Sequence, residues 1–170
     1  MSIILGLNCF HADSSACIIK DGQIICAIEE ERINRIKHWA GFPLQSIKEC
    51  LKISNINFDQ ITDVTINTNP KSNLVPKIKF FLKNLIFGKK KIEIFKRYKN
   101  KTGIRKLLQE NFKFNKNLRF HYINHHISHI ASGYYLTNFK KATCLTIDGS
   151  GDFSSLTISK CNNNKIEIIK

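Results

Sequence analysis

The chain has 170 residues, of which 42% are hydrophobic and 24% charged, and its formal net charge is +14. These fractions are typical of a soluble globular chain, long enough for one domain with a core or for part of a larger protein. No apolar run approaches the roughly 20 residues that a membrane-spanning helix needs. The apolar N-terminus also lacks the basic leading segment and the small-residue cleavage site of a signal peptide. We therefore expect no transmembrane segment, and we interpret the N-terminus as a strand.

The positive charge is concentrated in one part of the chain. Residues 71–119 contain 16 Lys and Arg and only 2 Glu, whereas the rest of the chain contains 11 basic and 11 acidic residues. One segment of the protein, and not the protein as a whole, is therefore basic.

The cysteines show no pairing pattern. There is no CxxC pair among the six, which are Cys9, Cys17, Cys26, Cys50, Cys144 and Cys161. Most lie in apolar surroundings, where a free cysteine behaves as a small hydrophobic residue. We expect free thiols in a reduced, cytoplasmic protein, and no cysteine-based zinc site.

The first 70 residues predict strands, then a helix, then another strand. The apolar run 2–9 predicts a buried strand, and Asp21-Gly22 between two apolar runs predicts a β-hairpin, because both residues tolerate a positive φ. Pro43 suits the first position of a helix. Three apolar residues share one face of that helix: Leu44, Ile47 and Leu51. Residues 61–68 alternate moderately and predict a strand, which gives the order β-β-β-α-β.

The basic segment, residues 71–119, predicts helical or loose structure interrupted at Gly88. One amphipathic stripe has the residues Phe80, Phe81, Leu85 and Ile86. A second amphipathic stretch spans residues 104–112. We interpret the whole segment as an insertion and not as a core element.

The last 50 residues return to regular structure. We expect a short strand at 120–124 and a helix at 125–137 with Asn124 as its N-cap. Residues 141–160 predict a strand, a glycine turn and a second strand, which echo residues 1–30. A further strand is expected at 165–170. No terminal helix or polar tail follows it, so we expect the chain to be the N-terminal part of a longer protein.

Three histidines occupy five positions of the expected helix. His125 and His129 are four residues apart, so their side chains share one helical face and can bind one metal ion. His126 points about 100° away, which follows from the 3.6-residue turn. Two ligands are too few for a stable site, so a third must come from elsewhere. The alternative is a hydrogen-bonded polar helix face without a metal.

The glycine-rich stretch TIDGSGD, residues 146–152, is a candidate phosphate site. Gly149 and Gly151 permit close backbone approach, and successive N–H groups in such a turn can bind an anion. Asp148 and Asp152 flank these glycines and can contact phosphate or its metal. An ordinary hairpin turn is an equally good interpretation of this motif alone.

Two polar stretches near the N-terminus complete the set of candidate sites. The loop at 8–16 can hydrogen-bond a phosphate or a metal-bound water through His11, Asp13, Ser14 and Ser15, or these can bond their own backbone. The stretch at 29–43 suits an anion through Arg32, Arg35, Lys37 and His38, or is a solvated loop with Trp39 buried. The strand–polar loop–strand units at both ends of the chain are alike. Two such loops facing each other are the nucleotide-binding plan of the actin, sugar-kinase and heat-shock ATPase superfold.

Four motifs in this order resemble a known family. They are GLNCFHADSSACIIKDG, AIEEERINRIKHWAGFP, NHHISHIASGYYLTNF and TIDGSGDFSS, which cover about half of the 170 residues. The sequence is similar to the N-terminal part of the carbamoyltransferases that act on nodulation factors, cephem antibiotics and aminoglycosides. The resemblance implies an α/β fold with a mixed sheet and flanking helices, the first lobe of that superfold, here truncated within one lobe spanning 1–170. The basic segment has no counterpart in the resemblance.

The resemblance also implies a reaction. Carbamoyl phosphate and ATP form carbamoyl-adenylate in a C-terminal domain that this chain lacks, and the carbamoyl group passes to a hydroxyl of a sugar-like or antibiotic-like acceptor. It implies a divalent metal, iron in relatives, held by His125 and His129, with a further Asp far downstream. Asp148 to Asp152 would hold phosphate, and His11 or His38 would accept the hydroxyl proton. His126 would contact the substrate or hold the residues of the site in position. The remaining expected substrate contacts are Asp13, Ser14, Ser15, Arg32 and Lys37.

Other readings stay open. The remainder of the enzyme would lie in the same or another chain, and a homodimer is possible. The less favoured alternatives are an inactive truncated paralogue and a nucleic-acid-binding protein, in which the lysines of the basic segment attract phosphate and its aromatic residues stack on bases. Those residues are Lys89, Lys90, Lys91, Lys96, Arg97, Lys99 and Lys101, with Phe80, Phe81, Phe87, Phe95 and Tyr98.

Overall fold

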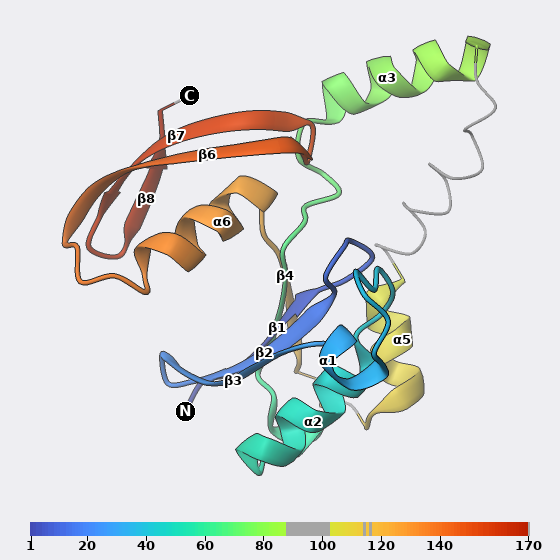
Figure 1. Ribbon diagram of the computed structural model, residues 1–170, viewed down its shortest axis with the longest axis vertical. Coiled ribbons are helices and arrows are strands. Elements are labelled where there is room, and N and C mark those ends of the chain that lie inside the picture. Colours follow the sequence, from blue (N-terminus) through green and yellow to red (C-terminus); the bar gives the residue numbers. More distant parts are fainter. Residues whose placement is uncertain (88–102, 114, 116, 170) are drawn as a thin grey trace. The chain divides into compact units, whose positions relative to one another are not determined.

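The computed structural model describes residues 1–87, 103–113, 115 and 117–169 (Figure 1). The chain forms two compact units. Unit 1 comprises Met1–Ile66 and Lys89–Tyr122, and unit 2 comprises Asn67–Gly88 and Ile123–Lys170. Each unit has its own β-sheet.

Unit 1 is built on a five-stranded mixed sheet in the order β3-β2-β1-β4-β5. The strands are β1 Ile3–Asn8, β2 Ser15–Lys20, β3 Gln23–Glu29, β4 Asp63–Ile66 and β5 Arg119–Tyr122. The predicted hairpin is confirmed, because β2 and β3 are antiparallel and Asp21 and Gly22 between them have φ values of 49° and 85°. β1 is antiparallel to β2 but parallel to β4, so the predicted mixed sheet is also confirmed.

The helices of unit 1 supply the rest of its core. They are α1 Glu31–Asn34, α2 Leu44–Ser54, the short 3₁₀ helix η1 Phe58–Gln60 and α5 Ile104–Asn111. Helix α2 packs against β2 and β3, and its Ile47 and Cys50 share one cluster with Leu5 and Ile18 of the sheet, all four fully buried. Full burial of an aliphatic side chain contributes about 1.5–3 kcal/mol, so this apolar layer is a main source of stability.

The start of α2 is held by an acidic residue outside the helix. The Glu30 carboxylate is buried and accepts hydrogen bonds from the backbone N–H groups of Gln45 (3.1 Å) and Ser46 (2.7 Å). These are two of the N–H groups that a helix leaves unbonded at its first turn. Glu30 therefore performs the capping role that Pro43 cannot.

The interpretation of residues 71–119 as an insertion is wrong for its C-terminal part. Ile104 and Leu108 of α5 are fully buried, and Leu118 is 5% exposed in the same cluster as β1 and α2. The amphipathic stretch at 104–112 was predicted, but the dense lysines around it hid the fact that the core requires this helix. Most of the basic and aromatic residues proposed to bind nucleic acid, and the side chains of the Phe80, Phe81, Leu85 and Ile86 stripe, lie outside the described residues.

Unit 2 has a three-stranded antiparallel sheet in the order β6-β7-β8. Its elements are α3 Leu74–Phe87, α6 His125–Tyr134, β6 Lys141–Gly151, β7 Ser154–Asn162 and β8 Lys165–Ile168. The predicted N-cap is confirmed, because the Asn124 side chain accepts hydrogen bonds from two backbone N–H groups in the first turn of α6. Helix α6 packs on one face of this sheet (Figure 1). No helix in the described ranges is both long and apolar enough to cross a membrane.

The hairpin of unit 2 does not turn at the glycines. Asp152 and Phe153 form the turn with φ values of 51° and 64°, whereas Gly149 and Gly151 lie within β6. The register shifts between Ile147 and Gly151, so β6 carries extra residues there. Such a bulge redirects side chains, and it decides where Asp148 points.

An ionic cluster on β4 gives a stability prediction for unit 1. The buried Asp63 carboxylate accepts two hydrogen bonds from the Arg119 guanidinium (2.9 and 2.8 Å) and one from His121 Nε2 (2.6 Å). The Arg119 guanidinium and these other donors hold the pKa of Asp63 well below its usual range, although burial opposes them. We expect Asp63→Asn to lower the free energy of unfolding by about 2 kcal/mol at neutral pH.

This contribution depends on pH with a definite sign. Because the folded pKa of Asp63 is depressed, its stabilising effect is full above the unfolded value of about 3.9 and is lost as pH falls below it. Urea unfolding followed by the fluorescence of Trp39 measures the difference between wild type and variant. The gap is expected to close in acid, and Asp59→Asn, at an exposed carboxylate, is the matched control. An equal loss in both variants would contradict the prediction.

Candidate functional site

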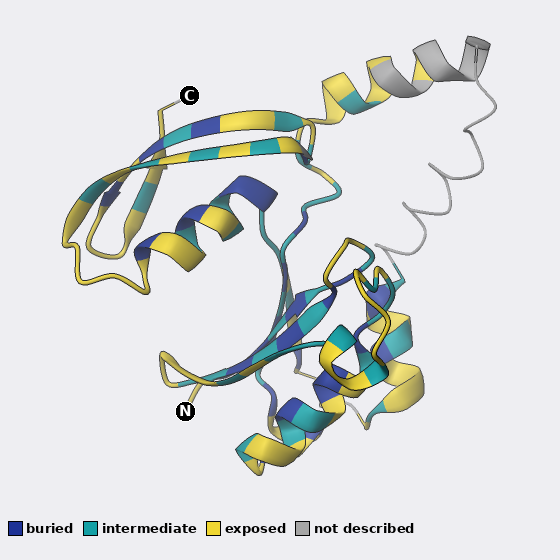
Figure 2. Cartoon of the chain, viewed as in Figure 1, coloured by how far each residue is buried: buried dark blue, intermediate teal, exposed yellow. Residues whose placement is uncertain are grey.

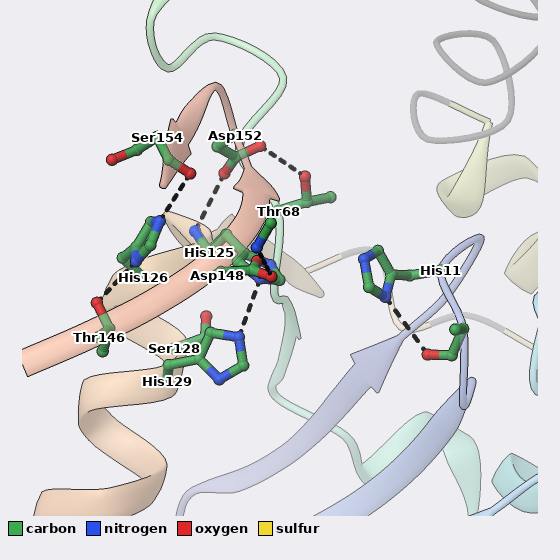
Figure 3. A network of polar contacts seen from close by, with 12 residues as sticks. His11, Thr68, His125, His126, Ser128, His129, Thr146, Asp148, Asp152 and Ser154 are labelled. Carbon is green, nitrogen blue, oxygen red and sulfur yellow. Dashed lines mark hydrogen bonds and ion pairs between the residues drawn. The ribbon is translucent and has the colours of Figure 1, made fainter. Parts of the chain in front are cut away.

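Three ligand-type side chains converge in unit 2 (Figure 3). His125 Nε2 lies 2.9 Å from His129 Nε2 and 2.8 Å from Asp148 Oδ2. The His125 side chain is 9% exposed and that of Asp148 32% exposed, while His129 is on the surface. One imidazole is thus held inside the protein and the other two groups face outward around it.

Local structure explains how these side chains meet. Residues 125 and 129 are one helical turn apart on α6, as their spacing predicted. Asp148 reaches them because the bulge in β6 turns its side chain toward α6, and the Gly149 N–H fixes it by donating to Asp148 Oδ1 (2.6 Å). Gly151 faces the His125 ring so closely that a Cβ there would lie 2.7 Å from Cγ and 2.8 Å from Nε2.

The electrostatics of the cluster favour a carboxylate anion. Burial raises the pKa of Asp148, but the Gly149 N–H and the nearby His125 and His129 outweigh it, and the pKa lies below its usual range. An ionised carboxylate beside two imidazoles is a set of three lone-pair donors around one point. This donor set attracts a divalent cation.

The geometry also fits a metal ion. Ligand atoms bound at about 2.1 Å and at right angles to one another are about 3 Å apart, close to the observed separations. Two imidazoles and one carboxylate are the ligands of many non-haem iron(II) sites. The sequence predicted that the third ligand had to come from elsewhere and expected Asp148 to contact phosphate or its metal. Within the described residues, Asp148 instead stands as the third candidate ligand.

His126 lies in a different environment from its neighbours. Its ring is fully buried, with Nδ1 2.7 Å from Thr146 Oγ1 and Nε2 3.0 Å from the Ser154 carbonyl oxygen. Both nitrogens are therefore engaged by the sheet, and His126 anchors α6 to β6 and β7. Of the two roles expected for His126, this placement favours support of the site over contact with a substrate.

Asp152 is also engaged inside unit 2. Its carboxylate accepts hydrogen bonds from Thr68 Oγ1 (2.9 Å), the Asn69 N–H (2.9 Å) and the His125 N–H (3.1 Å), and Lys77 Nζ lies 4.0 Å away. The side chain is 4% exposed. The expectation that Asp152 binds phosphate conflicts with this arrangement, because its oxygens already serve these donors. Thr68 and Lys77 were missed in the sequence, since nothing in their local pattern links them to residue 152.

The two N-terminal motifs meet in unit 1. His38 Nδ1 donates to Asp13 Oδ1 (2.9 Å), and the His38 N–H donates to Glu31 Oε2 (3.0 Å). Asp13 and His38 both have left-handed backbone, with φ values of 60° and 55°. Ser14 links the two loops, because its buried hydroxyl donates a hydrogen bond to the Gly41 carbonyl (2.8 Å).

Of the remaining predicted residues, some have a structural role and the others lie on the surface. Ser14 braces the loop, so its expected substrate contact gives way to a structural role, and Ser15 begins β2 opposite Asn8. His11 is exposed near the Ala12 carbonyl, and Lys37 is exposed. Arg32 is 70% exposed and lies 3.4 Å from Glu29. Glu31 joins the Asp13–His38 pair, although no local pattern singles it out.

The Asp13–His38 pair yields a titration prediction. The hydrogen bond and the charge of Asp13 raise the pKa of His38 above its ordinary value, with a smaller contribution from Glu31. Asp13→Asn is expected to return that pKa toward about 6.5. Since the folded pKa is raised, the pair stabilises the fold at low pH, and that effect is lost as pH rises through the folded pKa.

An NMR titration of the His38 ring protons in both proteins measures this change. Asp59→Asn, which removes an exposed carboxylate elsewhere in unit 1, is expected to leave the His38 titration in place. Identical His38 curves in wild type and Asp13→Asn would show that the pair does not form in solution.

Comparisons with known proteins agree on the family. A family profile described as "Carbamoyltransferase N-terminus" matches residues 3–169. The nodulation protein NolNO of Sinorhizobium fredii is 33% identical over 150 residues, which cover 87% of this chain and 21% of that protein. The uncharacterized protein MJ1051 of Methanocaldococcus jannaschii is 31% identical over 167 residues, with coverage of 98% and 26%. The uncharacterized protein sll1178 of Synechocystis is 29% identical over 177 residues, with coverage of 98% and 28%.

The fold has a counterpart among solved structures. YeaZ from Pseudomonas aeruginosa superposes with a TM-score of 0.51 at 8% identity, covering 100% of this chain and 65% of that one. This likeness concerns the fold alone, and it supports the predicted α/β class of the actin, sugar-kinase and heat-shock ATPase superfold. The chain spans only 21% to 28% of the length of the three curated relatives. Since the family profile matches all but three of its residues, the chain belongs to the carbamoyltransferase family, in the part described as its N-terminus.

Proposed function

We propose that this chain contributes the metal-binding and acceptor-activating part of an O-carbamoyltransferase. The reaction moves a carbamoyl group from carbamoyl-adenylate, made from carbamoyl phosphate and ATP, to a hydroxyl of a sugar-like or antibiotic-like acceptor. Membership of the family supports carbamoyl transfer, and the short span relative to its relatives means that the complete reaction needs further polypeptide.

The convergence of His125, His129 and Asp148 is the observation that carries this proposal. These residues would hold a divalent ion, with iron favoured by the donor set. A bound ion would supply Lewis acidity toward a phosphate or carbamoyl oxygen. The protein's own part is to keep His125 buried and oriented through Gly151 and the Asp152 carboxylate.

The Asp13–His38 pair would act on the acceptor hydroxyl. With Nδ1 donating to Asp13, the neutral ring presents Nε2 as the nitrogen that accepts a proton. Asp13 fixes this tautomer and stabilises the imidazolium that results. His38 therefore becomes the preferred proton acceptor, with the exposed His11 as the second choice.

The metal assignment can be tested on the 170-residue protein. Anaerobic titration with Fe²⁺, followed by calorimetry and metal analysis, is expected to give one ion per chain. His129→Ala removes a candidate ligand at an exposed position of unit 2, so the variant is expected to fold. It is expected to weaken iron binding by about 100-fold or more. His121→Ala, which removes a half-exposed imidazole from unit 1, is the matched control.

The reaction itself needs a second measurement. The chain is co-expressed with the remainder of a carbamoyltransferase relative, and carbamoylated hydroxyl products are detected by mass spectrometry with carbamoyl phosphate and ATP supplied. His38→Ala is expected to reduce product formation without changing iron binding. Full activity in His38→Ala, or iron binding equal in His129→Ala and wild type, would refute the corresponding part of the proposal.

A further inference from the structure

Helix α3 presents an apolar face to its surroundings. Of the seven α3 side chains that the structure describes, six are exposed and none is buried. Figure 2 shows these exposed positions in the first part of α3. The apolar ones, with exposed fractions of 51%, 63%, 54% and 53%, are Leu74, Val75, Ile78 and Leu82. Helices α2, α5 and α6, by contrast, each bury several side chains.

These four apolar side chains share one face of α3. Successive residues of an α-helix are about 100° apart, so positions 74, 75, 78 and 82 fall within an arc of about 100°. When a helix packs on a protein core, such a stripe is the part that is buried. Residues 80–87 have the sequence FFLKNLIF, so the apolar composition continues to the end of the helix. A contiguous exposed apolar surface of this kind indicates a binding site for a partner.

Lys77 determines which flank of α3 is held by unit 2. Its ammonium group donates hydrogen bonds to the carbonyl oxygens of Asn69 (3.2 Å) and Pro70 (3.3 Å). It also lies 4.0 Å from the carboxylate of Asp152, whose side chain is 4% exposed. Lys77 precedes Ile78 in the chain, so their side chains point about 100° apart around the helix. The flank with Lys77 therefore contacts unit 2, and the apolar face points away from that contact.

The charge around the apolar face has a single sign. Residues 64–92 contain seven lysines and neither Asp nor Glu. One of these lysines, Lys79, is exposed and lies at the edge of the apolar face, four residues after Val75. An apolar face bordered by lysines is complementary to a surface that is anionic outside and apolar beneath, as in a bilayer that contains anionic lipids.

We propose that α3 binds the surface of an anionic lipid membrane. The helix would lie parallel to the bilayer, with Leu74, Val75, Ile78 and Leu82 at the level of the acyl chains. Lys79 would keep its ammonium group among the headgroups while its stem lies along the apolar boundary. With 14 residues, α3 is shorter than the roughly 20 that a spanning helix needs, so it would lie on the membrane. This inference concerns where the protein is held and does not depend on the proposed reaction.

Other partners match this face less well. Nucleic acid also attracts lysines, but it offers bases for aromatic stacking and no apolar medium for Leu, Val and Ile side chains. Lysine is depleted in protein–protein interfaces, so a protein partner is a poorer match for the lysine-rich border. A second copy of this chain would bring a further formal net charge of +14 against the first.

Vesicle binding by the 170-residue chain tests the proposal. Co-sedimentation compares vesicles of phosphatidylcholine and phosphatidylserine with vesicles of phosphatidylcholine alone. We expect the partition coefficient to be about tenfold or more higher for the anionic vesicles. Ile78→Asp is expected to lower it by about tenfold or more, because a charge replaces an inserted apolar side chain. Lys79→Glu is expected to lower it by about fivefold or more.

Each variant has a matched control on α2. Ile53 is 55% exposed, against 54% for Ile78, so Ile53→Asp makes the same change at an equally exposed isoleucine. Lys48 is exposed like Lys79, so Lys48→Glu makes the same change in net charge. Both controls are expected to leave vesicle binding intact, and circular dichroism confirms that each variant is folded.

Four results would overturn the proposal. The first is wild-type protein that binds no anionic vesicles, and the second is equal vesicle binding by Ile78→Asp and Ile53→Asp. The third is a dimer of this chain, seen by light scattering, that Ile78→Asp dissociates. The fourth is a complex with the co-expressed remainder of Synechocystis sll1178 that Ile78→Asp disrupts and that no longer binds vesicles, because a protein would then cover the face.

Discussion

Gly151→Ala is expected to weaken strongly the iron binding proposed for His125, His129 and Asp148, whereas Gly149→Ala is expected to leave it intact. A Cβ at residue 151 would overlap the His125 imidazole, 2.7 Å from Cγ and 2.8 Å from Nε2. The ring is buried and cannot move aside without leaving the other two ligands. At Gly149 the added Cβ would meet nothing within 4 Å. We expect an affinity loss of about 100-fold or more for the first change, similar to the loss of a ligand.

Metal titration of both alanine variants measures this difference. The metal-free proteins are compared in parallel by NMR, where the His125 ring signals are expected to shift only in Gly151→Ala. Circular dichroism separates a displaced ring from an unfolded protein. Iron binding by Gly151→Ala equal to that of wild type would mean that His125 does not need its observed position.

Asp152→Asn is expected to destabilise unit 2 by about 3–4 kcal/mol, which is the range found when one partner of a buried charged pair is removed. The Asp152 carboxylate accepts hydrogen bonds from Thr68 Oγ1 and from the N–H groups of Asn69 and His125. An amide has one acceptor oxygen, which would serve the two N–H groups now bonded to Oδ2, while its NH₂ group would stand in place of Oδ1 beside Thr68 and Lys77. Lys77 would lose its buried counter-charge as well.

Hydrogen exchange of the β6 and β7 amides reports this loss residue by residue. Asp59→Asn is the control, because it makes the same chemical change at an exposed carboxylate of unit 1. Weaker iron binding is expected to accompany the loss, since Asp152 holds the backbone of His125. Unchanged protection in β6 and β7 would contradict the role given to Asp152.

Local patterns in the sequence predicted local structure well. The Asp21-Gly22 hairpin, the Asn124 cap and the shared helical face of His125 and His129 follow from neighbouring residues alone. The amphipathic stretch of α5 was predicted, but its place in the core was not. The lysines around it suggested a solvated insertion, and only packing against the sheet reveals that Ile104 and Leu108 are core residues.

The parts of the site that escaped prediction depend on distant contacts. Asp148 approaches His125 because of a bulge whose position the sequence does not mark. Asp13 and His38 were each singled out, but their pairing across 25 positions requires both loops to be folded together. Asp152 was expected to bind a ligand, and two of the three donors that occupy it come from residues 68 and 69, in a stretch without any motif.

The buried Glu30 has a consequence for the loop that carries His38. Its N–H donates to the Ser14 carbonyl (2.9 Å) while its carboxylate holds the start of α2, so the loop is fastened where it begins. At the far end the Gly41 carbonyl accepts from the Ser14 hydroxyl. The conformational entropy of this loop is therefore lost during folding and not during substrate binding. Under the proposed function, such preorganisation would leave the binding free energy of an acceptor available for holding its hydroxyl in line with His38.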